Sequence, residues 1–124
     1  MNKNRNGFSL IEVLIGLVLL AIGLLAIAGM QITSVRGNFF SKNMSEASVV
    51  AQDRLEELRN RPYGNGELAA GNHNDGAIAF GGTTFTRDYT VAVIPGTTML
   101  NIVVNVRWRD TTDHVISFTT VRSQ

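Results

Sequence analysis

Residues 1–30 read MNKNRNGFSLIEVLIGLVLLAIGLLAIAGM, and this stretch organises the rest of the chain. A short polar leader ends at Gly7, and an apolar run follows over residues 8–30, in which only Ser9 and Glu12 have polar side chains. A helix needs about 20 apolar residues to cross a bilayer core, so the run is long enough. A carboxylate in hydrocarbon costs a few kcal/mol unless it is paired, which makes Glu12 the first functional candidate.

The chain has 124 residues, enough for one domain. We divide it into a leader (1–7), a membrane-spanning helix (8–30), an amphipathic helix (31–61), and a Gly/Asn-rich loop followed by an antiparallel β-sheet (62–124). The last part is too small for a comfortable core of its own, so it should rest on the helix before it. There is no cysteine, and therefore no disulfide can stabilise it.

The formal charge of the whole chain is +1, and removing Lys3 and Arg5 with the leader takes it to −1. A near-neutral body lacks the basic surface that nucleic-acid binding requires, so we expect no nucleic-acid partner. The two leader cations have no acidic neighbour, so the positive-inside rule predicts a cytoplasmic N-terminus. Everything after Met30 should then lie across the membrane.

Residues 31–61 have the pattern of an amphipathic helix. Gly37 and Asn38 weaken it without forming a turn, and Pro62 ends it by disfavouring helical backbone at Arg61. Apolar residues recur at spacings of 3, 4, 4 and 3, which predicts one buried stripe: Met44, Ala47, Ala51, Leu55 and Leu58. The charged residues Glu56, Glu57, Arg59 and Arg61 should form a solvated face.

Residues 62–82 are rich in Gly, Asn and Ala and are predicted to form a loop. Three strands should follow, at 83–95, 99–109 and 114–121, joined by short turns in an antiparallel meander. In the first strand Arg87 interrupts the apolar face. The second strand should pack on the helix stripe through its inward residues: Leu100, Ile102, Val104, Val106 and Trp108. The predicted fold class is α+β, with a long N-terminal helix packed on a small antiparallel sheet.

The string GFSLIEVLIGLVLLAIGLLAIAGMQ resembles the N-terminus of type IV pilins and of the related type II secretion pseudopilins. The shared pattern is a basic leader ending in Gly7, then Phe8, then Glu12 as fifth residue of the mature chain. The resemblance implies cleavage between Gly7 and Phe8 by a prepilin peptidase that also N-methylates Phe8. It further implies residence in the inner membrane before assembly with other major and minor pilins, and then a place in a pilus, in the periplasm or on the cell surface.

Within that family, AIGLLAIAGMQ and the later VRWRD and HVISFTTV look most like PilV-type minor pilins, the type IV pilus modification proteins. Two features depart from many pilins. The chain has no cysteine for a C-terminal disulfide loop, and the second half of its apolar helix has Gly29 but no proline. The small size and bare C-terminal region favour a minor subunit over a major one.

Physical reasoning gives Glu12 a role in such an assembly. Cleavage creates an α-amine at Phe8, close to the membrane surface. Where parallel helices are staggered, the Glu12 carboxylate of one chain can face the Phe8 amine of the next, so that each charge is neutralised and the axial register is fixed. Apolar burial between the helices supplies most of the adhesion.

Other interpretations of residues 1–30 remain open. Glu12 could reach back to the headgroups, and Ala26-Ile27-Ala28 could be a signal-peptidase site, although signal-peptide apolar segments are shorter, at about 7 to 15 residues. A type II secretion pseudopilin shares every N-terminal feature. From another class, a membrane-anchored periplasmic binding module should tolerate Glu12→Ala.

The remaining polar and aromatic residues suggest structure more than chemistry. His73 and Asp75 could contact a metal but fit turn residues better, and His114 should begin a strand. Trp108 fits a core residue better than an adhesive platform. Asn43-Met44-Ser45 matches a glycosylation sequon inside a predicted helix, where such matches are often false. We find no catalytic constellation and expect no enzyme activity, cofactor or metal.

Overall fold

A computed structural model describes residues 7–123, so residues 1–6 of the predicted leader lie outside the described residues. One helix, α1 (Leu10–Asn60), is followed by a short 3₁₀ turn, η1 (Gly66–Leu68), and four strands. The strands are β1 (Gly71–Phe80), β2 (Thr83–Val93), β3 (Leu100–Arg109) and β4 (Asp113–Arg122). The chain divides into two compact units, one ending at Phe39 and one beginning at Phe40, and α1 contributes to both.

The first unit contains the N-terminal part of α1. The helix begins at Leu10, two residues later than expected, and Gly37 and Asn38 are helical. Every residue from Gly7 to Phe39 is exposed. Among the described residues, α1 is the one helix long and apolar enough to cross a membrane.

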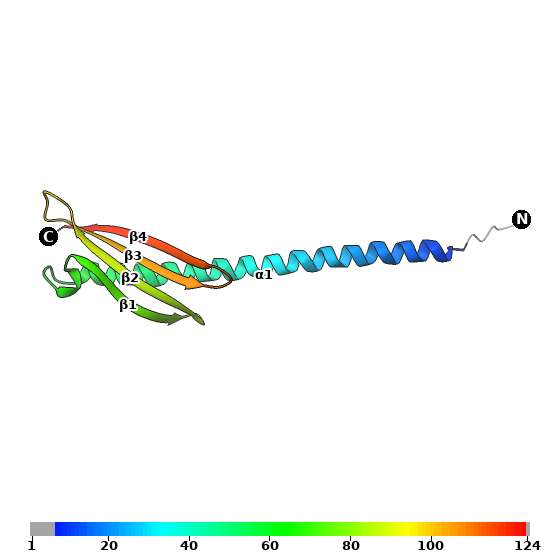
Figure 1. Cartoon of the computed structure of the whole chain (residues 1–124), viewed down its shortest axis with the longest axis horizontal. Helices are drawn as coiled ribbons and strands as arrows, with labels where there is room; N and C mark the ends of the chain where they lie inside the picture. The colour runs from blue at the N-terminus through cyan, green and yellow to red at the C-terminus, as the bar shows by residue number, and fades with distance from the viewer. Residues whose placement is uncertain (1–6, 124) are drawn as a thin grey trace, which may run out of the picture. The chain divides into compact units, whose positions relative to one another are not determined.

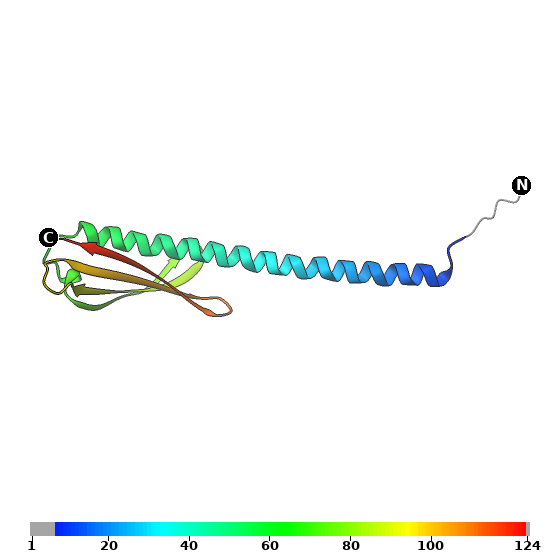
Figure 2. The same cartoon turned by 90° about the horizontal axis from the view of Figure 1, so that it is seen from above.

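The second unit, which we call the head, packs residues 40–60 of α1 against a four-stranded antiparallel sheet in the order β1-β2-β3-β4. In Figures 1 and 2 the strands lie side by side along this part of the helix. Consecutive strands pair throughout, so the sheet is the expected meander. The prediction of an α+β fold, with one long N-terminal helix on a small antiparallel sheet, is confirmed.

The prediction of a loop over residues 62–82 was wrong, because this segment contains η1 and β1. β1 pairs with β2 from Gly71↔Val91 to Phe80↔Thr83, with a bulge between Asn74 and Gly76. Its sequence, GNHNDGAIAF, lacks the apolar alternation of a half-buried strand. The polar side chains on its helix-facing side are stabilised instead by charged partners in the head, which are described below.

The core of the head lies between α1 and the inner face of the sheet. Ala47, Ala51, Leu55 and Leu58 of the predicted helix stripe belong to it, with Leu55 partly buried and the others buried, as do the five predicted inward residues of β3, which are all buried. Met44, by contrast, is 45% exposed. The buried side of α1 keeps Ala47, Ala51 and Leu58 of the predicted stripe and adds three residues that were not predicted: Asn43, Val50 and Arg54. Two polar residues thus lie where an apolar stripe was predicted.

The turn between β1 and β2 lies close against the helix. The Lys42 Nζ donates to the Gly81 carbonyl oxygen at 2.9 Å, and Thr83 Oγ1 donates to Asn43 Oδ1 at 3.0 Å. Gly81 has a φ of +59°, and a Cβ at this position would collide with the Glu46 carboxylate. The adjacent Gly82 has a φ of +86° but no atom within 4 Å of where its Cβ would be.

This pair of glycines gives a matched prediction. Gly81→Ala should lower the free energy of unfolding of the head by about 2 kcal/mol, because left-handed backbone strain adds to the cost of displacing the Glu46 carboxylate from its ion pair with Lys42. Gly82→Ala should cost about 1 kcal/mol, because it has the strain alone. The only tryptophan, Trp108, is 4% exposed, so its fluorescence reports urea unfolding of the full chain in detergent micelles. When Glu46→Ala is also present, the loss in free energy of unfolding caused by Gly81→Ala should fall close to the loss caused by Gly82→Ala. Equal losses for the two single glycine variants would contradict the clash with Glu46.

Candidate processing and assembly site

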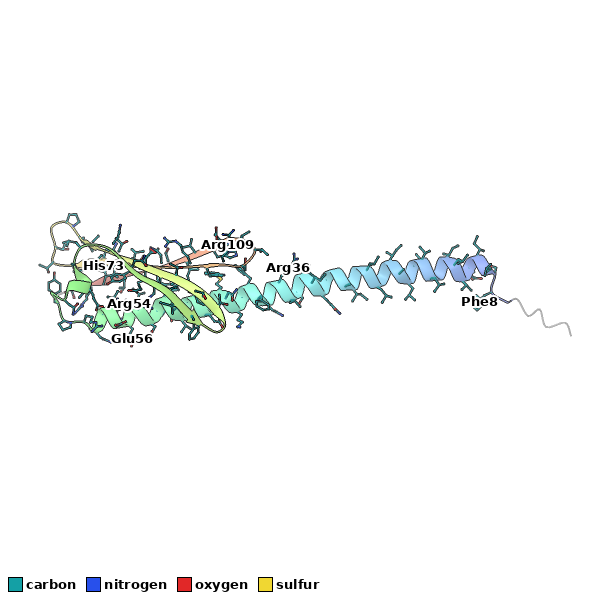
Figure 3. All side chains as sticks on the ribbon, turned by 60° about the horizontal axis from the view of Figure 1, so that its bottom comes forward. Phe8, Arg36, Arg54, Glu56, His73 and Arg109 are labelled. Carbon is teal, nitrogen blue, oxygen red and sulfur yellow. The ribbon has the colours of Figure 1, made fainter. Side chains whose placement is uncertain are left out.

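The predicted scissile bond lies just ahead of the helix. Gly7, Phe8 and Ser9 precede the first helical residue and are exposed, Phe8 by 84%. Figure 3 labels Phe8 at this end of α1. The Gly7–Phe8 peptide is therefore outside the regular hydrogen-bond ladder of the helix and open to a protease.

Ser9 caps α1, a feature that the sequence reasoning missed. Its Oγ accepts a hydrogen bond from the backbone N–H of Glu12 at 3.3 Å, and its carbonyl oxygen accepts from Glu12 N at 3.1 Å and Val13 N at 3.2 Å. Ser at the N-cap with Glu three residues later is the capping-box signature. The string Ser9-Leu10-Ile11-Glu12 was thus a sequence signal for where the helix begins.

Glu12 lies in the first turn of α1 and is exposed. Within residues 7–123 its carboxylate has no hydrogen-bond or ion-pair partner. A carboxylate in the first turn is stabilised by the positive end of the helix dipole. The charge is thus tolerated at this position while remaining available to a cation from outside the chain.

The rest of the first unit presents apolar side chains around the helix, as the sticks in Figure 3 show. Leu19 and Leu25, for example, are 65% and 74% exposed. Gly16, Gly23 and Gly29 lie among these exposed residues, and small residues on a helix surface let the backbone of a neighbouring helix approach closely. A surface of this kind is stable only in a bilayer or against other apolar helices.

In the head, Asp75 was expected to be a turn residue. It instead joins an ion-pair cluster between α1 and the sheet. Its carboxylate lies 3.0 Å from Arg54 Nε and 2.7 Å from Arg87 Nε. Arg54 also pairs with Glu57 at 2.7 Å, and Arg87 Nη1 donates to the Val50 carbonyl oxygen at 3.0 Å. The expectation that Asp75 belongs to a turn was therefore wrong, and Arg87 interrupts the apolar face because it serves this cluster.

The cluster has electrostatic consequences. Burial opposes the charge of Arg54, but its hydrogen bond with Glu57 and the charge of Asp75 outweigh that cost and raise the pKa of Arg54 above its ordinary value. The hydrogen bond from Arg54 lowers the pKa of Glu57. Burial raises the pKa of Tyr89, whose ring lies 5.0 Å from the Arg54 guanidinium carbon. All these groups have charge partners within the head, which indicates a structural role.

Both histidines pack against aromatic rings. His73 lies in β1, not in a turn as predicted; it stacks on Tyr89 at 4.6 Å between ring centroids, and its Nε2 lies 2.8 Å from the Ala69 carbonyl oxygen. His114 is the second residue of β4, near the expected strand start, and stacks on Trp108 at 5.2 Å. Among the described residues no group of three or more His, Cys, Asp or Glu side chains could hold a metal ion.

The β3–β4 turn is fixed by Asp110. A hydrogen bond of 3.0 Å from the Thr112 backbone N–H lowers the pKa of Asp110 to about 2, and His114 Nε2 lies 3.0 Å from the same carboxylate oxygen.

The sequon residue Asn43 is 5% exposed and hydrogen-bonded to Thr83, so its amide is not accessible for glycosylation in the folded head.

Comparison with known proteins bears on the N-terminal segment. Residues 2–28 match the model of the prokaryotic N-terminal methylation motif, which includes Gly7, Phe8 and Glu12. No curated protein and no solved structure gives a significant match to the chain. A motif of this type implies processing by a prepilin peptidase and assembly with pilin partners in general. The motif, followed by an apolar helix suited to membrane anchoring and an α+β head, supports a type IV pilin-like prepilin, a structural and non-enzymatic class of protein.

Proposed function

We propose that this chain is a minor pilin, cleaved between Gly7 and Phe8, N-methylated on Phe8, and then built into a type IV pilus or used to prime its assembly. The observation that carries the proposal is the arrangement at the helix start. The exposed Gly7–Phe8 bond lies outside α1, inside the matched methylation motif, and the first turn of α1 contains the Glu12 carboxylate, which has no partner among residues 7–123.

Cleavage changes the charge balance at this end of the helix. The new Phe8 amine is a cation beside the positive end of the helix dipole, where it is disfavoured. The Glu12 carboxylate of a neighbouring chain offers it a partner, and the same pairing removes an unpaired acid from a region of low dielectric. Both charges therefore favour one axial stagger between parallel helices.

The exposed apolar surface of residues 8–30 supplies the adhesion. Before assembly it would be covered by the inner membrane, which the chain crosses once with its N-terminus in the cytoplasm. After assembly it would be covered by the helices of other major and minor pilins. Before assembly the head would lie on the far side of the membrane from the cytoplasmic N-terminus.

One feature of the head supports a minor subunit over a major one. The sequence has no cysteine to close a C-terminal disulfide loop of the kind that many pilins carry.

Two measurements on cells that make the protein test the proposal. Mass analysis of its N-terminal peptide should find a methylated Phe8, and the protein should co-purify with sheared pili. Deletion should reduce surface pili and leave protein export unchanged. A mature N-terminus at Gly29 would reject pilin processing, while loss of export with normal pili would reassign the chain to a type II secretion system.

A further inference from the structure

Ser9 is the N-cap of α1 and directly follows the Gly7–Phe8 peptide, the proposed cleavage site. The Ser9 carbonyl oxygen is the first to accept in the helical ladder, from Glu12 N and Val13 N, while its Oγ accepts from Glu12 N at 3.3 Å. The carbonyl of Gly7, two residues earlier, belongs to the segment ahead of the helix. Ser is among the strongest N-cap residues because its side chain satisfies a donor that the helix leaves free.

We propose that Ser9 is a positioning residue for prepilin cleavage, holding the Gly7–Phe8 peptide outside α1 so that a peptidase can reach its carbonyl. The inference rests on the proposed function, because it presumes cleavage at this bond. In that step water adds to the Gly7 carbonyl carbon and the C–N bond breaks, leaving a carboxylate on Gly7 and an amine on Phe8. The attacked carbonyl must be free of other hydrogen bonds and open to approach.

The sequence shows what would happen without the cap. Alanine is a poor N-cap but the best helix former, so Ser9→Ala favours a helix that starts earlier. The nearest acceptable cap upstream is Gly7, since glycine is tolerated at an N-cap. With Gly7 as the cap, its own carbonyl would accept the first intrahelical hydrogen bond and the scissile peptide would enter the first turn.

Substitutions at Ser9 separate this role from direct recognition of the serine by a peptidase. N-cap strength ranks Asn with Ser, Gly slightly lower, and Ala far below. We therefore expect Ser9→Asn and Ser9→Gly to be cleaved within about twofold of the unmodified chain, and Ser9→Ala about fivefold more slowly. A peptidase pocket that reads the shape of residue 9 would give the reverse order, with Ala best accepted and Asn worst.

The experiment uses the full-length chain in detergent micelles with a purified prepilin peptidase, and follows the loss of the leader by mass. Carbon chemical shifts of residues 8–12, recorded in the same micelles without the peptidase, should keep Leu10 as the first helical residue in Ser9→Asn and Ser9→Gly, and move the helix start upstream in Ser9→Ala. If the peptidase only recognises residue 9 directly, the helix start should be the same in all of these chains.

The outcomes distinguish the inference from the function it rests on. If the unmodified chain is not cut between Gly7 and Phe8, the proposed function fails. If it is cut there but Ser9→Ala is processed as fast as Ser9→Asn, or the helix start does not move, the positioning role of Ser9 is overturned while the processing site remains.

Discussion

Glu12→Ala should leave cleavage after Gly7 largely intact and reduce the amount of this subunit in sheared pili at least tenfold. Two effects act in the same direction. An unpaired carboxylate raises the free energy of the membrane-embedded chain by about 3 kcal/mol, so its removal favours the membrane state. Loss of one partner from a poorly solvated charge pair also costs the assembled state about 3 kcal/mol or more. The measurement is the ratio of subunit in the pilus fraction to subunit in the membrane fraction.

Glu12→Gln and Val13→Ala are the matched controls. Glu12→Gln keeps the size and hydrogen-bonding capacity of the side chain without its charge, so it should fail to incorporate nearly as badly as Glu12→Ala. Val13→Ala shortens the neighbouring side chain in the same helical turn and leaves the charge of the chain unchanged, so this variant should incorporate normally. Normal incorporation of Glu12→Ala would remove the basis for charge-fixed register.

Asp75→Ala should destabilise the head by about 3 kcal/mol. The side chains of Arg54, Asp75 and Arg87 are only 9%, 14% and 13% exposed, so removing the shared carboxylate leaves two poorly solvated guanidinium groups with less compensation. Breaking a buried ion pair by deleting one partner is far more costly than replacing the whole pair by apolar groups. Urea unfolding of the full chain in micelles, followed by Trp108 fluorescence, measures the change.

The Asp88–Arg107 pair on the outer face of the sheet provides the control. Asp88 also lies in a strand and pairs with an arginine, but its partner's side chain is 53% exposed. Asp88→Ala should therefore cost less than about 1 kcal/mol, as exposed ion pairs do. If Asp75→Ala proved no more destabilising than Asp88→Ala, the cluster would contribute little to the stability of the head.

The sequence was sufficient to predict α1 and strands β2, β3 and β4, because their apolar residues repeat with the periods of a helix and of half-buried strands. It was not sufficient for β1, whose inward positions include His73 and Asp75. These side chains are stable there because Tyr89, Arg54 and Arg87 face them, and those partners lie on other elements. Apolar periodicity identifies a strand by its apolar residues, so it misses a strand that is stabilised by polar contacts.

A polar residue at a core position also explains why the buried stripe of α1 was predicted incorrectly. Arg54 lies three residues after Ala51 and four before Leu58, so it occupies a core position by spacing. Its charge excluded it from an apolar stripe, and Met44 was included in its place. At the N-terminus the string Ser9-Leu10-Ile11-Glu12 matches the capping-box signature, and the structure shows the half of it that Ser9 supplies, the hydrogen bond from Glu12 N to Ser9 Oγ.

The tight approach of the β1–β2 turn to the helix decides where the protein can accept an epitope tag for locating it in a filament. Residues inserted beside Gly81 would break the Lys42 contact to its carbonyl and collide with Glu46. The β2–β3 connection is less constrained at Gly96, where nothing lies within 4 Å of where a Cβ would be, and the hydrogen bond that joins this connection to another segment, from Tyr63 Oη to the Thr98 carbonyl oxygen, lies two residues later. Lengthening a surface loop costs little, so a labelled subunit is best made by insertion there.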